Sequence, residues 1–122
     1  MRLNHMDLQV SDVTRAREFF ETFFELRCVY QRAEQIALLE DETGFSLAVS
    51  NLFGSPAPAY PADFHVGFVL ERESDVRAHY ERLQEAGVPM KRELGRGGPN
   101  VYFTCLGPDS IPVEVSAPRD EA

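Results

Sequence analysis

The chain reads Asn4-His5-Met6-Asp7-Leu8-Gln9-Val10-Ser11-Asp12 near its start, and this stretch decides the fold class. Apolar residues at positions 6, 8 and 10 alternate with polar ones, which predicts a strand with one buried and one polar face. Ser11 and Asp12 then offer side-chain oxygens that can cap a helix. Apolar residues follow at helical spacing: Val13, Ala16, Phe19, Phe20, Phe23 and Phe24. The sequence therefore predicts a strand that leads into an amphipathic helix.

The same order of elements begins again about 60 residues later. Residues 64–70 form an apolar strand candidate, Ser74 and Asp75 can cap a second helix, and Gly87 can end it. Three further strand candidates follow each helix, at 27–32, 35–40 and 45–51 and again at 90–93, 101–106 and 111–116. This repeat predicts an internal duplication, in which His5 and His65 are equivalent and Ala48 corresponds to Glu114.

The length of 122 residues predicts a single domain, 1–122. Within it we expect module one at 1–52, module two at 63–118 and an acidic tail at 119–122. The segment 53–62 between the modules carries one glycine and three prolines, which is typical of an irregular linker. Residues 95–100 are expected to form a plain hairpin connection, with a lid as the alternative.

Composition excludes several classes of protein. Hydrophobic residues make up 43% and charged residues 26%, which are ordinary values for a globular domain. The net charge of −8 disfavours a nucleic-acid surface, and no apolar run is typical of a membrane span or a signal peptide. We therefore expect a cytoplasmic protein with no nucleic-acid or membrane partner. Cys28 and Cys105 are expected to be reduced, and Cys105 to be unreactive.

Three segments together resemble the vicinal oxygen chelate superfamily, which includes glyoxalase I, bleomycin-resistance proteins and extradiol dioxygenases. They are residues 3–12 with the helix around Phe20, residues 64–68 with the helix that ends at 85–88, and residues 107–115, where Gly107 and Ser110 depart from the family's usual turn. The resemblance covers nearly the whole chain. It implies an α+β fold of two βαβββ modules that form an open, incomplete barrel around a cavity, and it implies a homodimer that takes a small-molecule substrate or ligand.

The resemblance also implies a metal site. In metal-binding members the ligands come from four equivalent strand positions, which here hold His5, Ala48, His65 and Glu114. Ala48 cannot bind a metal, so the implied set is two imidazoles and one carboxylate. That set is typical of Fe(II), with Mn(II) also suitable and Zn, Ni or Co less so. The competing interpretation is that both histidines are ordinary polar residues inherited through the duplication.

Two functions follow from these alternatives. The first is a metal-dependent enzyme acting on a substrate with adjacent oxygens, with dioxygenase-type ring cleavage as the first expectation and Tyr102 and Asp7 as acid–base candidates. A standard glyoxalase or epimerase is disfavoured by Ala48. The second is a metal-free, cofactor-free protein that sequesters a cationic drug or metabolite, as bleomycin-resistance proteins do.

Several other residues have plainer interpretations. Tyr102 can equally be part of the cavity wall, and Asp7 can be a polar residue facing water or a group that holds a metal-bound water. His79 is expected to face solvent from the second helix. The cations Lys91, Arg92 and Arg96 are expected to be solvated.

Overall fold

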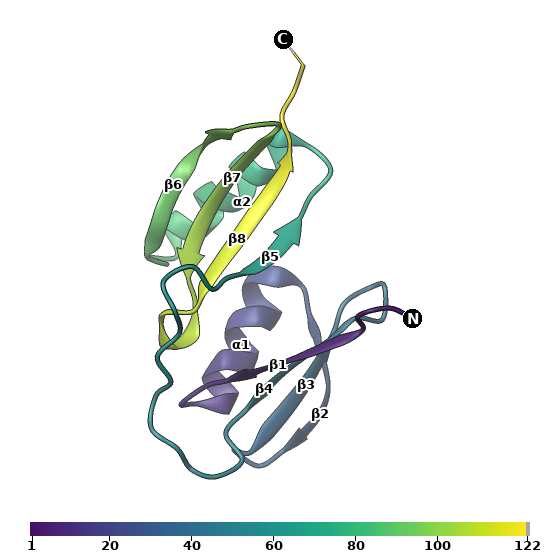
Figure 1. The fold of residues 1–122 in the computed structure, drawn as a ribbon, viewed down its shortest axis with the longest axis vertical. Coiled ribbons are helices and arrows are strands. Elements are labelled where there is room, and N and C mark those ends of the chain that lie inside the picture. The colour runs from purple at the N-terminus through teal and green to yellow at the C-terminus, as the bar shows by residue number, and fades with distance from the viewer. Residues whose placement is uncertain (122) are drawn as a thin grey trace. The chain divides into compact units, whose positions relative to one another are not determined.

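The computed structural model describes residues 1–121 and contains two units with the same order of elements (Figure 1). The chain divides into two compact units, unit 1 at Met1–Ala59 and unit 2 at Tyr60–Ala122. Unit 1 contains β1 (His5–Gln9), α1 (Val13–Phe24), β2 (Arg27–Arg32), β3 (Ile36–Glu40) and β4 (Ser46–Ser50). Unit 2 contains β5 (Val66–Val69), α2 (Glu73–Glu85), β6 (Met90–Gly97), β7 (Asn100–Leu106), the 3-10 turn η1 (Pro108–Ser110) and β8 (Pro112–Pro118). The predicted α+β class with two βαβββ modules is confirmed. Ala122, the last residue of the predicted tail, lies outside the described residues.

The sheet of unit 1 has the strand order β1-β4-β3-β2 and is open at both edges. β1 pairs with β4 in parallel, and the other pairs are antiparallel. Leu8, Val49 and Phe20 are fully buried, because alternate residues of β1 and β4 face the apolar side of α1. The predicted cap is confirmed, since the Asp12 side chain accepts a hydrogen bond from the Arg15 N–H at 3.0 Å.

The sheet of unit 2 has the equivalent order β5-β8-β7-β6, again with one parallel pair. Val113, Val115 and Phe103 are buried on the face that α2 covers. Residues between them in the sequence, such as Glu114 and Thr104, are half-buried and lie on the opposite face. Each unit therefore has one sheet face sealed by its helix and one face that carries the polar residues.

Two boundaries differ from those expected from the sequence. Helix α2 begins at Glu73, so Ser74 and Asp75 lie in its first turn and no side chain caps it. The Glu73 carboxylate instead accepts hydrogen bonds from Arg96 and from the Asp120 N–H. Strand β6 continues to Gly97, so the glycine-rich segment is mostly strand, and the expected hairpin turn is made by residues 98 and 99.

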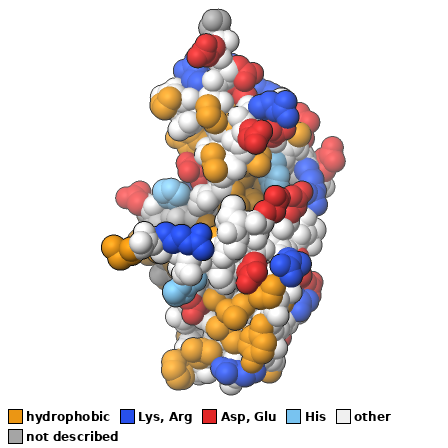
Figure 2. Space-filling view, turned by 90° about the vertical axis from the view of Figure 1, so that its right-hand side faces the viewer, with side chains coloured by type: hydrophobic (Ala, Val, Ile, Leu, Met, Phe, Trp, Pro, Cys, Tyr) orange, Lys and Arg blue, Asp and Glu red, His pale blue; other side chains and the backbone are white. Residues whose placement is uncertain are grey.

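The molecular surface is mixed in character. Figure 2 shows acidic and basic side chains interspersed on the face in view, together with groups of apolar side chains. The exposed apolar residues of unit 1 include Val29, Tyr30, Leu52 and Phe53. In the described part of the chain, neither helix has the length and apolar composition needed to cross a membrane.

Candidate active site

Each unit presents a histidine whose ring is oriented by an oxygen atom. In unit 2, Nδ1 of His65 lies 3.1 Å from the backbone carbonyl oxygen of Asp63. In unit 1, Nδ1 of His5 lies 2.8 Å from the side-chain oxygen of Asn4. Because these oxygens accept hydrogen bonds, Nδ1 is the donor and Nε2 of the neutral ring carries the lone pair. In this tautomer, Nε2 of each ring is the nitrogen that can bind a metal.

The Glu114 carboxylate lies beside the Nε2 atom of His65. Oε2 of Glu114 is 3.9 Å from Nε2 of His65, and the two side chains are 29% and 52% exposed. Glu114 pairs across the strands with Gly67, and Oε2 is 3.6 Å from where a Cβ atom of Gly67 would stand. The carboxylate thus extends over a residue without a side chain. The structure brings two of the three predicted metal ligands together within unit 2.

The corresponding place in unit 1 has its carboxylate on the other strand. Ala48 of β4 pairs with Asp7 of β1, as Glu114 of β8 pairs with Gly67 of β5. Ala48 and Glu114 are therefore equivalent in register, as the repeat predicts. Asp7 accepts a hydrogen bond from the Ser50 hydroxyl at 2.7 Å. Unit 1 consequently presents a histidine and a carboxylate as unit 2 does, but both stand on its first strand.

The predicted ligands are divided between the units. His5 belongs to unit 1, whereas His65 and Glu114 belong to unit 2. Within either unit taken by itself, residues 1–121 contain no group of three His, Cys, Asp or Glu side chains placed to hold a metal ion.

Tyr102 stands on the polar face of the unit 2 sheet, between Arg92 and Gly97. The Arg92 guanidinium carbon lies 3.7 Å from the centroid of the Tyr102 ring. A Cβ atom at Gly97 would come within 2.7 Å of the same ring, so only glycine leaves room for it there. Among residues 1–121 the Tyr102 hydroxyl makes no hydrogen bond, which leaves it available to a ligand.

Cys105 of β7 lies on the opposite face of the sheet from Tyr102 and Thr104. Cys105 is buried, and this burial raises the pKa of its thiol to about 11. The thiol is therefore protonated at neutral pH, as expected for a cysteine that takes no part in chemistry.

The expectation about His79 is wrong, and that about the cations of β6 holds for the two that are exposed. His79 does not face solvent but is half-buried, with its ring 6.4 Å from that of Phe103. Lys91 and Arg96 of β6 are exposed, as expected for solvated cations, whereas Arg92 is half-buried against the Tyr102 ring. Lys91 donates to the Ala62 carbonyl, Arg92 donates to the Tyr102 carbonyl at 3.0 Å, and Arg96 pairs with Glu73 at 3.2 Å.

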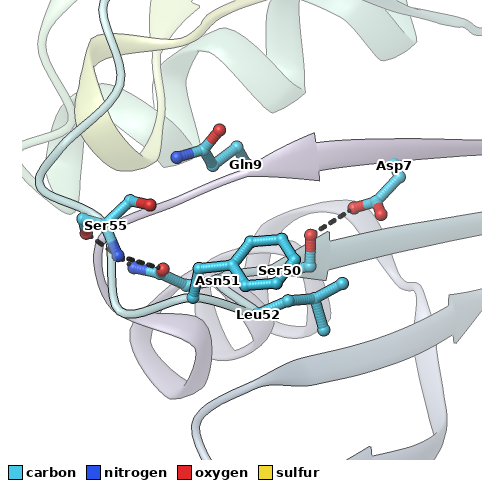
Figure 3. Close-up of a pocket in the computed structure, with 7 residues that line it drawn as sticks. Asp7, Gln9, Ser50, Asn51, Leu52 and Ser55 are labelled. Carbon is cyan, nitrogen blue, oxygen red and sulfur yellow. Dashed lines mark hydrogen bonds between the residues drawn. The ribbon is translucent and has the colours of Figure 1, made fainter.

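A pocket of about 230 Å³ opens beside β1 in unit 1 (Figure 3). Figure 3 shows Asp7 and Gln9 on β1, Ser50 at the end of β4 and Ser55 in the following loop. Asn51 holds that loop through two hydrogen bonds with the backbone of Ser55, at 2.8 and 2.9 Å. The sequence did not predict this pocket, because its wall depends on the path of the loop after β4.

The chemistry of this pocket is polar with one charge. It is lined by Asp7, Gln9, Ser50, Asn51, Leu52, Phe53 and Ser55, of which Asp7 is the ionisable member. The Ser50 hydroxyl donates a hydrogen bond to one carboxylate oxygen of Asp7, and this bond orients the carboxylate. The pocket is suited to a small molecule with a hydrogen-bond donor or a positive charge near Asp7.

Comparison with known proteins agrees with this architecture. Residues 2–115 match the model of the Glyoxalase/Bleomycin resistance protein/Dioxygenase superfamily. A structure described as a possible glyoxalase from Bacillus cereus is 33% identical with a TM-score of 0.83, over 94% of this chain and 97% of that one. No curated protein matches the sequence.

More distant structures share the fold. A lactoylglutathione lyase from Agrobacterium tumefaciens is 17% identical with a TM-score of 0.80, over 95% of this chain and 92% of that one. A glyoxylase/bleomycin resistance protein/dioxygenase domain from Frankia sp. EAN1pec is 17% identical with a TM-score of 0.82, over 98% of both chains. With the family model spanning nearly the whole sequence, this chain belongs to the glyoxalase/bleomycin resistance protein/dioxygenase superfamily.

Proposed function

We propose that this protein is a small-molecule metalloenzyme whose divalent metal is held by His5, His65 and Glu114. The observation that carries the proposal is the 3.9 Å approach of His65 Nε2 to Glu114 Oε2 in unit 2. Two ligand atoms about 2.1 Å from a shared ion lie roughly 3 to 4 Å apart, so the pair fits one ion. His5 is the equivalent residue of unit 1 and has the same orientation through Nδ1.

The donor set favours Fe(II) or Mn(II). Two neutral imidazoles and one carboxylate leave further coordination positions for substrate, an arrangement typical of Fe(II) oxygenases. When bound, the metal would polarise two adjacent oxygens of a substrate or activate O₂. This favours a dioxygenase-type reaction over the standard glyoxalase reaction, because Ala48 leaves out one of the carboxylates that the four-ligand members use.

The chain's own residues supply positioning and proton transfer. Asp7 is fixed by Ser50 and retains a free carboxylate oxygen toward the pocket, so it can accept a proton from a bound hydroxyl. Tyr102 is fixed by Arg92 and Gly97 with its hydroxyl unpartnered among the described residues, so it can donate one. Both stand on the polar faces of their sheets, away from the helices.

A second function is favoured by the pocket in unit 1. Its charged lining residue is Asp7, and the whole chain carries a net charge of −8, so a small cationic molecule would be attracted to it. This is the metal-free alternative, in which the protein sequesters a drug or metabolite. We further propose that the protein acts in the cytoplasm as a homodimer, and sedimentation equilibrium of the purified chain tests the dimer.

The metalloenzyme proposal is tested by titrating chelator-treated protein with Mn(II) and following free Mn(II) by electron paramagnetic resonance. The parent protein should bind one equivalent, and His65→Ala and Glu114→Ala should each lose it. Ser116→Ala is the matched control, because Ser116 stands on the same strand and the same face as Glu114 and should leave binding intact. Loaded protein is then screened under air with catechols and other substrates that have adjacent oxygens. Equal Mn(II) binding by all four proteins would refute the site.

A further inference from the structure

We propose that Arg92, with Thr104 and the Tyr102 hydroxyl, binds a carboxylate group carried by the substrate. This inference deepens the proposed function, because it assigns a chemical class to the substrate of the same sheet face. It concerns unit 2 alone. The substrate it describes has adjacent oxygens at one end and a planar anionic group at the other.

The register of the unit 2 sheet places these residues in line with Glu114. Arg92 of β6 pairs with Thr104 of β7, Thr104 pairs with Glu114 of β8, and Glu114 pairs with Gly67 of β5. Paired residues in a sheet project from the same face, and neighbouring strands lie about 4.8 Å apart. Arg92 therefore stands two strands, roughly 10 Å, from Glu114 on the same polar face. That separation suits the two ends of a small aromatic or short-chain substrate.

Arg92 is held in place without being neutralised. Its guanidinium stacks on Tyr102 at 3.7 Å and donates through one nitrogen to the Tyr102 carbonyl at 3.0 Å. No carboxylate among residues 1–121 forms an ion pair with it. In contrast, Arg96 on the same strand is paired with Glu73. A half-buried, pre-oriented cation with unused donors, in a chain of net charge −8, is a specific anion site rather than part of a general positive field.

The strand is built to accommodate this stack. A Cβ at Gly97 would come within 2.7 Å of the Tyr102 ring, and the Cβ position of Gly95 is 3.8 Å from an Arg92 nitrogen. Gly97 thus leaves the space that the Tyr102 ring occupies, whereas a side chain at Gly95 would meet the guanidinium at ordinary contact distance. The Thr104 hydroxyl, which makes no hydrogen bond among the described residues, adds a donor beside the guanidinium. A planar carboxylate can accept two parallel hydrogen bonds from the fork of the guanidinium.

The test uses the full chain after removal of metal, so that it does not depend on the metal site. Benzoate and its uncharged isostere benzamide are titrated into nitrogen-15-labelled protein. Benzoate should shift the Arg92 side-chain and the Tyr102 and Thr104 amide resonances saturably, and benzamide should not. Arg92→Gln should weaken benzoate binding roughly tenfold or more, because a charge-assisted hydrogen-bonded pair is lost.

Two further variants keep the outcome interpretable. Arg27→Gln removes the same charge from an exposed arginine of unit 1 and should leave benzoate binding unchanged. Gly97→Ala keeps the charge of Arg92 but displaces the Tyr102 ring, and it should also weaken binding. Equal shifts with benzoate and benzamide, or equal affinities in the parent and Arg92→Gln proteins, would overturn the inference. Failure of Mn(II) binding with benzoate binding intact would refute the metal site and leave the carboxylate site standing.

Discussion

Asp7 pairs with Ala48 across β1 and β4, at the place where unit 2 pairs Gly67 with Glu114. In unit 1 the carboxylate belongs to the first strand, β1, whereas in unit 2 it belongs to the last strand, β8. In unit 2, Oε2 of Glu114 lies 3.9 Å from Nε2 of His65, a separation that two ligands of one metal ion can have. In unit 1 the Asp7 carboxylate is fixed by Ser50 at the edge of a pocket. This difference between equivalent positions supports the proposed ligand role of Glu114 and the proposed acid–base role of Asp7.

Asp7→Asn should separate metal binding from turnover. The substitution keeps the shape of the side chain and the Ser50 contact but removes the basic oxygen. Metal content should stay unchanged, while turnover of any substrate found in the screen should fall by about 10² to 10⁴-fold, the usual contribution of a general base. Glu40→Gln is the control, since Glu40 is paired with Arg27 at 3.8 Å rather than lining the pocket. Loss of bound metal in Asp7→Asn would instead make Asp7 a ligand.

Glu73→Gln should remove a pH-dependent part of the stability of unit 2. The hydrogen bond from Arg96, then that from the Asp120 N–H, lowers the pKa of Glu73 below its ordinary value of 4.5. A lowered pKa in the folded state stabilises the fold above the ordinary value, and that contribution is lost as the pH falls through the lowered pKa. Urea unfolding should show Glu73→Gln to be less stable than the parent at pH 7, with the gap closing in acid. A gap that widens in acid would contradict this assignment.

The two thiols should differ in accessibility. Cys105 is buried with a pKa raised to about 11, so about one molecule in a thousand carries the thiolate at pH 8. Cys28 is half-buried, with its sulfur 3.5 Å from the Tyr30 carbonyl oxygen. A disulfide reagent should therefore modify one thiol per native chain and two after denaturation. Rapid modification of Cys105 in the native protein would show that β7 opens readily.

Phe103→Ala should be strongly destabilising. Phe103 is fully buried and packs against the rings of His79 and Tyr80, at 6.4 and 5.2 Å. Loss of a buried phenylalanine typically costs about 3 to 5 kcal/mol through lost burial and the cavity left behind. Phe53→Ala is the control, because it removes the same side chain from a position that is 90% exposed. It should lower the free energy of unfolding by less than about 0.5 kcal/mol. Thermal unfolding of both variants measures the difference, and equal losses would contradict the assigned core.

The repeat and the sheet faces could be predicted from the sequence, because alternation along 5–10 and the caps and breakers around each helix are local signals. His5, His65 and Glu114 could be proposed as ligands because the duplication makes their positions equivalent. Arg92 could not be predicted as a binding residue, because its orientation depends on a contact with the Tyr102 ring across a bulged strand pair. The pocket beside Asp7 depends in the same way on the fold of the 51–55 loop.

The most direct test of the metalloenzyme proposal is elemental analysis of the full chain, purified without a chelator and without a metal-affinity tag. The account predicts Fe or Mn near one atom per chain in the parent and the Ser116→Ala control, and its loss in Glu114→Ala. Metal-free parent protein that also fails to take up added Fe(II) or Mn(II) would contradict the account and favour the pocket of unit 1 as a binding cleft for a cationic ligand.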